Sequence, residues 1–127
     1  MDISAIRKKI YLLEQQRQNT LAYLLKPEEM VSGSVYSAYK KCGNKRCRCA
    51  KGELHGPFNY LSKRVDGKTV LSFVRKADEE EIIRQAGHYR DYIKQMAKLN
   101  RIDKRIYDNL KKIKQAKTKN YERPKKV

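Results

Sequence analysis

Residues 40–57 read KKCGNKRCRCAKGELHGP and contain all three cysteines of the chain together with one of its two histidines. The spacing is Cys-x4-Cys-x-Cys-x5-His, running from Cys42 through Cys47 and Cys49 to His55. Three thiols and one imidazole form a complete ligand set for a closed, four-coordinate zinc site. We therefore predict that these four residues bind metal and that the cofactor is zinc.

The same stretch is strongly basic, because residues 40–51 contain six cations and no acidic residue. A metal ion that fixed this segment would present the cations together, as a rigid positive surface suited to phosphates. We predict that this surface binds nucleic acid through Lys40, Lys41, Lys45, Arg46, Arg48 and Lys51.

Other interpretations of the cysteines stay open at this point. Three reduced thiols without a metal, surrounded by cations, would be easily oxidised, and Cys47 with Cys49 could act as a redox sensor. Cysteine catalysis is less favoured, since His55 and His88 are the only histidines and His88 falls on an expected helix. The sequence contains no Ser-His-Asp set, phosphate-binding glycine loop or paired carboxylates, so we expect no enzymatic activity.

The charge of the whole chain is large and unevenly distributed. Its 127 residues carry 31 Lys and Arg against 14 Asp and Glu, for a net charge of +17. The excess lies in residues 40–51, 60–76 and 111–127, whereas residues 1–30 and 77–110 are nearly balanced. Such a distribution favours a directed anion-binding face over a uniformly solvated surface, although a ribosome-like tail is the plainer alternative.

We expect no membrane partner and no secretory signal. No apolar stretch approaches the roughly 20 residues of a membrane span, and residues 1–10 lack an apolar core after a basic start. An odd number of cysteines in a basic segment suits a reducing compartment. The expected location is therefore cytoplasmic, in association with the nucleoid.

Two helices are expected at the two ends of the chain. Residues 1–26 form the first, with a helical apolar period from Ile3 to Leu25 that Pro27 ends. Residues 78–116 form a long second helix that starts with four acidic residues and whose apolar residues advance by about the heptad step of 3.5. Residues 117–127 read as a basic, disordered tail.

The middle segment, residues 32–76, is expected to hold the zinc loop and a small antiparallel sheet. Strands are predicted near residues 35–39, 58–65 and 68–75, the last two joined by the hairpin turn Asp66-Gly67. We expect Phe58 and Phe73 in the core and leave Tyr60 undecided, since stacking of rings on nucleic acid is the competing role. The hairpin cations predicted to extend the binding surface are Lys63, Arg64, Lys68 and Arg75.

Together these elements predict an α+β fold and a single domain. A long antiparallel helical hairpin or coiled coil would flank a small antiparallel β-sheet that carries the zinc-binding loop. Because the first helix is much shorter than the last, we expect the apolar stripe from Ile102 to Ile113 to lie uncovered. This predicts a homodimer through the C-terminal helix, with an ordinary intramolecular core as the alternative.

A distinctive set of residues supports a family resemblance over about residues 30–100. It comprises Gly33-Ser34, Tyr39, Cys42-Gly43, Cys47-Arg48-Cys49, His55-Gly56-Pro57, Phe58-Asn59-Tyr60-Leu61 and Asp66-Gly67-Lys68-Thr69. The chain resembles a small uncharacterised prokaryotic family with a Cys-Gly-x3-Cys-x-Cys…His-Gly-Pro-aromatic core before a long charged helix. Phe58 and Asn59 stand where that family often has tyrosines. The resemblance implies an association with transposases and other mobile elements.

The resulting hypothesis is a zinc-stabilised nucleic-acid-binding protein, a DNA-binding accessory factor of a mobile-element recombinase or nuclease. A transposase or nuclease is the expected protein partner, and DNA is favoured over RNA. Two alternatives remain: a coiled-coil oligomerisation adaptor that binds protein, and a basic factor associated with RNA or the ribosome.

Overall fold

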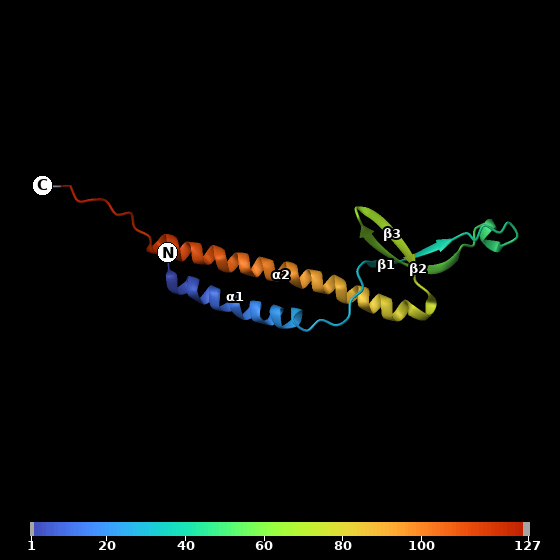
Figure 1. Ribbon diagram of the computed structural model, residues 1–127, viewed down its shortest axis with the longest axis horizontal. Helices are drawn as coiled ribbons and strands as arrows, with labels where there is room; N and C mark the ends of the chain where they lie inside the picture. The colour runs from blue at the N-terminus through green and yellow to red at the C-terminus, as the bar shows by residue number, and fades with distance from the viewer. Residues whose placement is uncertain (1, 126–127) are drawn as a thin grey trace. The chain divides into compact units, whose positions relative to one another are not determined.

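A computed structural model describes residues 2–125 of the chain, and it has the expected α+β class (Figure 1). Its helices and strands follow one another in the order α1 (Ile3–Leu24), β1 (Ser34–Lys40), the 3-10 helix η1 (Arg48–Lys51), β2 (His55–Val65), β3 (Lys68–Phe73), the 3-10 helix η2 (Lys76–Asp78) and α2 (Glu79–Lys117).

The chain divides into two compact units, although the sequence led us to expect a single domain. The first consists of Met1–Lys26 with Gln95–Val127, and the second of Pro27–Lys94. The long helix α2 contributes its C-terminal part to the first unit and its N-terminal part to the second.

The helix boundaries agree with the sequence to within one or two residues. Asp2 begins α1, because its side chain accepts hydrogen bonds from the backbone N–H groups of Ser4 and Ala5. Residues 118–125 contain no helix or strand, and the last two residues of the expected tail lie outside the described part of the chain. Among residues 2–125, no helix has the length and hydropathy needed to cross a membrane.

In the first unit, α1 runs antiparallel to the C-terminal part of α2 (Figure 1). Arg17 Nε on α1 donates to Asp103 Oδ1 on α2 over 2.7 Å. Earlier on α1, Leu13 lines a surface pocket together with Asn109, which lies further along α2. Moving back along α1 therefore means moving forward along α2, as an antiparallel pair requires.

The core of this unit corrects one expectation about α2. Ile6, Leu13 and Leu24 of α1 are buried, and Ile102 of α2 is only 4% exposed. The expectation that the stripe from Ile102 to Ile113 is uncovered is therefore wrong at Ile102, whereas Leu110 of the same stripe is 49% exposed. The antiparallel α1 lies against the C-terminal part of α2, so the shorter helix covers the start of the stripe. The homodimer stays a prediction.

The second unit contains a three-stranded antiparallel sheet with the order β1-β2-β3. The predicted hairpin between β2 and β3 is confirmed, with Val65 and Lys68 as the pair that closes it. Both turn residues have left-handed backbone angles, φ 51° at Asp66 and φ 79° at Gly67. Asp and Gly tolerate this conformation better than other residues, and the turn thereby fixes the register of the hairpin.

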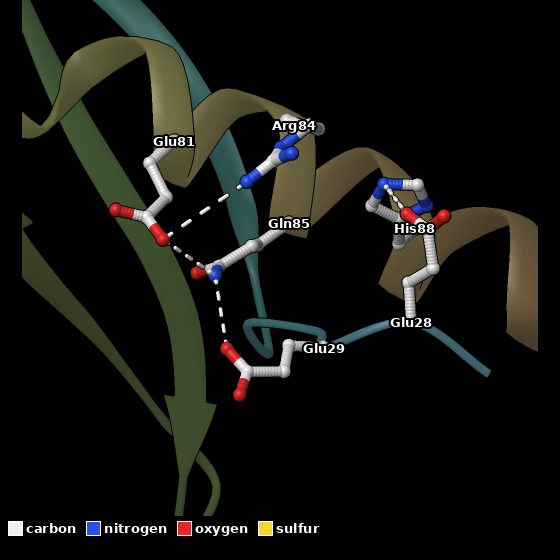
Figure 2. Close-up of polar contacts among 6 residues, drawn as sticks. All are labelled: Glu28, Glu29, Glu81, Arg84, Gln85 and His88. Atoms are coloured by element: carbon white, nitrogen blue, oxygen red, sulfur yellow. Dashed lines mark hydrogen bonds and ion pairs between the residues drawn. The ribbon is translucent and has the colours of Figure 1, made fainter.

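The linker between α1 and β1 is fastened to the first turns of α2 (Figure 2). Val31 N–H donates to the backbone oxygen of Gln85 over 3.1 Å, and the Gln85 side chain faces Glu29. His88 Nε2 lies 2.9 Å from Glu28 Oε2. The start of β1 is thus held at a defined position beside α2, and His88 has a structural role as a packing residue.

Adjacent leucines on α1 give a direct test of the first unit. Leu13 is 4% exposed and Leu12 is 67% exposed. We expect Leu13→Ala to lower the free energy of unfolding by about 2–5 kcal/mol, because it leaves a cavity between the helices. Leu12→Ala should change it by less than about 0.5 kcal/mol. Urea denaturation followed by helical circular dichroism measures both, and equal losses would contradict the packing described.

Candidate functional site

The candidate site lies in the connection from β1 to β2, residues 41–54, which we call the cysteine loop. Strand pairing fixes both of its ends, since Lys40 at the end of β1 lies opposite His55 at the start of β2. An irregularity between Ala38 and Lys40 shifts the register there. The sheet therefore places His55 at the base of the loop, facing back toward the cysteines that precede it.

Hydrogen bonds within the loop place the cysteines. The backbone oxygen of Asn44 accepts from Cys47 N–H over 3.0 Å, and its side-chain oxygen accepts from Arg46 N–H over 3.0 Å. The backbone oxygen of Cys47 then accepts from Ala50 N–H over 3.1 Å, which opens η1. This sequence of turns directs Cys47 and the buried Cys49 toward the same point.

The four predicted ligands, here called the Cys3His cluster, come together. Their ligand atoms all lie within 4.8 Å of one another, and the three cysteines are free. Cys42 Sγ is 3.4 Å from Cys49 Sγ, and Cys47 Sγ is 3.0 Å from His55 Nε2. A tetrahedral site with metal–sulfur bonds of about 2.3 Å and metal–nitrogen bonds of about 2.0 Å separates neighbouring ligands by about 3.5–3.8 Å. The cluster can therefore hold a metal ion.

The electrostatics of the cluster distinguish two of its thiols. The backbone N–H of Asn44, and next the Cys49 side chain, lower the pKa of Cys42. At Cys49 the backbone N–H of Cys42 acts to lower the pKa, and it lies 3.3 Å from the sulfur. Burial and the neighbouring sulfurs of Cys42 and Cys47 outweigh it, so the pKa of Cys49 is raised. A bound cation would outweigh this difference, because it favours the thiolate form of every ligand and so lowers the pKa of both thiols.

The close approach of β1 to the start of β2 requires a glycine directly after the predicted ligand His55. Gly56 has φ 135°, and a Cβ atom there would lie 2.9 Å from the backbone oxygen of Ala38. Any side chain would push β1 away from the start of β2. The His-Gly pair thus lets a metal ligand sit immediately beside the strand that ends in Lys40.

The six predicted cations of this segment, which we call the loop cations, are all exposed. None of the ion pairs found among residues 2–125 involves them. Lys40 contacts an aromatic ring, with its Nζ 4.3 Å from the centroid of Tyr60. The loop cations therefore remain available to bind anions, as their lack of acidic neighbours in the sequence suggested.

The predicted hairpin cations do not form one continuous surface. Arg64 Nη2 donates to the backbone oxygen of Gly67 over 2.7 Å and thereby braces the turn. Arg75 Nε pairs with Asp78 Oδ2 at 2.9 Å, at the start of α2. Lys63 and Lys68 are exposed, but Lys63 and Arg64 are successive strand residues and point to opposite faces. The structure thus assigns structural contacts to two of the four.

One aromatic face of the sheet was assigned incorrectly from the sequence. Phe73, expected in the core, is 56% exposed. It lies opposite Tyr60, and Tyr60 lies opposite Tyr36, so the three rings share a face. The sequence contained part of this information, because the Asp66-Gly67 turn alone sets Tyr60 opposite Phe73.

The other face supplies the apolar contact to α2. Val35 of β1 lines a pocket with Ile83 and the buried Ala86 of α2. Val35 lies on the face without the rings, because it follows Ser34 and precedes Tyr36 in β1 and successive strand residues point to opposite faces. Alternation along the strands therefore leaves Phe73 and its neighbours on the open side.

The chain belongs to the family of a domain of unknown function, DUF6788, whose model matches residues 3–84. This range contains α1, the whole sheet, the Cys3His cluster and the first turns of α2. The expected resemblance to an uncharacterised family is thereby confirmed. No curated protein and no solved structure matches the chain.

Metal analysis tests the cluster. We expect purified protein to carry about one transition-metal ion per chain, measured by plasma mass spectrometry, because the cluster supplies four ligands. Cys49→Ala should lose the metal, while Ala50→Ser, which changes an exposed neighbour in the same loop, should retain it. Protein that is metal-free as purified, binds no added metal and yet has an ordered loop by amide hydrogen exchange would contradict the site.

Proposed function

We propose that this chain is a zinc-stabilised nucleic-acid-binding protein that acts without enzymatic activity of its own. The observation that carries the proposal is the position of the Cys3His cluster among the six exposed loop cations, in residues 40–55, where Glu53 is the single acidic residue. Binding of one ion would order the cluster and the loop cations together, so a flexible cationic segment would become a rigid anion-binding surface.

Zinc is the metal that the donor set favours. Thiolate sulfurs select softer metal ions such as Zn²⁺ and Cu⁺ and reject Mg²⁺ and Ca²⁺. Three thiolates with one imidazole complete a tetrahedron and leave no position for a water or a substrate, which is typical of structural zinc sites. The burial of Cys49, which is 1% exposed, fits a closed site of this kind.

Phosphate is the anion that the loop cations fit best. Arginine binds phosphate through paired N–H groups, whereas lysine contributes a mobile point charge, and the loop offers both. A loop already fixed by metal loses little further conformational freedom on binding, so more of the contact energy contributes to affinity. With about six phosphates contacted, affinity should fall about a thousandfold between 50 and 200 mM salt.

Within this proposal we place the protein in the cytoplasm at the nucleoid, with DNA as its main partner. The proposed role as an accessory factor of a transposase or nuclease rests on the sequence resemblance of the cysteine segment alone. An RNA target would leave the same phosphate contacts in place, and the competition of structured RNA against duplex DNA separates the two.

A charge exchange on the loop tests the proposal. We expect Arg46→Glu with Arg48→Glu to weaken binding to a DNA duplex by at least tenfold and to lower the salt slope by about two, since each lost phosphate contact removes about one unit. Fluorescence anisotropy across a salt series measures both quantities.

The matched control is Arg7→Glu with Lys8→Glu, which makes the same change in net charge on exposed positions of α1. It should leave the slope close to that of the natural chain. Equal losses in the two variants would show a response to total charge and not to this surface. Metal content, measured on both, confirms that the loop variant keeps its structure.

A further inference from the structure

We infer that the open face of the sheet binds the unpaired bases of a single-stranded nucleic acid by stacking them on a row of aromatic rings. This inference deepens the proposed nucleic-acid function and rests on it, because it names a second surface and the form of nucleic acid bound. The row consists of Tyr36, Tyr60, Phe73 and Phe58, here called the ring row, and it crosses all three strands of the sheet.

The rings of the row contact one another in an unbroken series. The Tyr36 and Tyr60 rings are stacked, with centroids 5.6 Å apart and planes at 25°. Tyr60 meets Phe73 edge to face at 5.8 Å, and Phe73 meets Phe58 in the same manner at 6.2 Å. Each ring thus holds its neighbour in orientation, so the row forms a preorganised surface.

Two rings of the row are too exposed to be explained as a core. Phe73 is 56% exposed and Tyr36 is 39% exposed, while Tyr60 and Phe58 are half-buried, and Leu71 beside Phe73 on the same face is 52% exposed. An apolar surface left open in this way marks a binding site more often than a packing fault. Flat rings with free faces are the groups on which single-stranded nucleic acids stack their bases.

Positive charge at the edges of the row identifies a polyanion as the occupant. Lys40, the last residue of β1, lies over the Tyr60 ring and continues into the cysteine loop. At the other edge, Lys76 lines a pocket of about 560 Å³ with Phe58 and Phe73, although Glu79 also contributes to it. Bases on the row would therefore carry their phosphates toward Lys40 and the loop cations.

Duplex nucleic acid does not fit the row, because paired bases are already stacked within the helix and expose only their edges. A single strand offers base faces at no cost in unpairing. The shared chemistry is a run of unpaired bases on a phosphate backbone, from DNA or from RNA.

A single tryptophan makes stacking on the row directly visible. The chain contains no tryptophan, so Tyr36→Trp places a unique fluorophore in the row and keeps an aromatic ring there. We expect its fluorescence to be quenched by oligo-dT or oligo-U of about 12 nucleotides, a length within the range of known single-strand sites. A blunt duplex of equal length should quench it much less.

The matched control is Tyr11→Trp, on an exposed position of α1 that is 67% exposed. Its fluorescence should not respond to any of the three oligonucleotides. Equal quenching by oligo-dT and oligo-U supports stacking that does not depend on the sugar, and a preference for one assigns the site to DNA or to RNA. Absence of quenching at position 36 while the single strand is bound overturns the inference.

Substitutions that replace a ring by an aliphatic side chain measure how much that ring contributes to single-strand affinity. Tyr36→Leu and Phe73→Leu should each weaken single-strand binding about tenfold, since stacking on one ring is worth that much or more per base. Duplex affinity and metal content should not change, because neither side chain is one of the four predicted metal ligands. Tyr11→Leu is the control and should alter none of these quantities.

The outcomes separate the two proposals. If the natural chain binds neither single strand nor duplex, the proposed function itself fails. If both forms bind with equal affinity and the ring variants change neither, the inference about the ring row fails while the proposed function stands. If the ring variants leave single-strand affinity unchanged but lose a protein that the natural chain retains in a pull-down, the row is a protein-binding surface. That result overturns the inference.

Discussion

Cys49 is the only buried side chain in residues 41–54, and the hydrogen bonds of that loop join residues close in sequence. Ordering a residue costs about 1–2 kcal/mol of backbone entropy, and a loop without a core has little apolar burial to offset it. Strand pairing of Lys40 with His55 holds the two ends only. A metal bound by Cys42 and His55 near the ends, and by the cysteines between them, closes the interior of the loop. In the proposed function, the loop cations would depend on that closure for their arrangement.

Features encoded by local chemistry could be predicted from the sequence. The Asp66-Gly67 turn, the helix end before Pro27 and the acidic start of α2 each depend on a few neighbouring residues, and all were placed to within one or two positions. The ligand set belongs to the same class, since Cys42, Cys47 and Cys49 lie in the cysteine loop and His55 directly follows it. Their convergence follows from a short tether between two paired strands and needs no information about the rest of the fold.

The errors arose where distant elements decide the outcome. Alternation in β2 and β3 separates two faces of the sheet, but which of them faces α2 depends on where that helix lies, and Val35 lines a pocket with residues of α2. The burial of Ile102 likewise depends on which part of α2 the antiparallel α1 lies against. By contrast, Arg75 and Asp78 are three residues apart, so their pairing could have been predicted from the sequence. Counting cations did not take such local partners into account, and which of the cations bind nucleic acid stays a prediction.

The Cys3His cluster and the ring row are linked through Lys40. Lys40 lies opposite His55, one of the four predicted ligands, in the sheet and also over the ring of Tyr60. Strand pairing holds Lys40 and His55, whereas the other loop cations lie within residues 41–54, so loss of a bound metal would disturb those cations more than Lys40. The rings themselves lie on paired residues of β1, β2 and β3 and would keep their order. Metal loss should therefore impair the phosphate contacts of a bound strand more than the stacking of its bases.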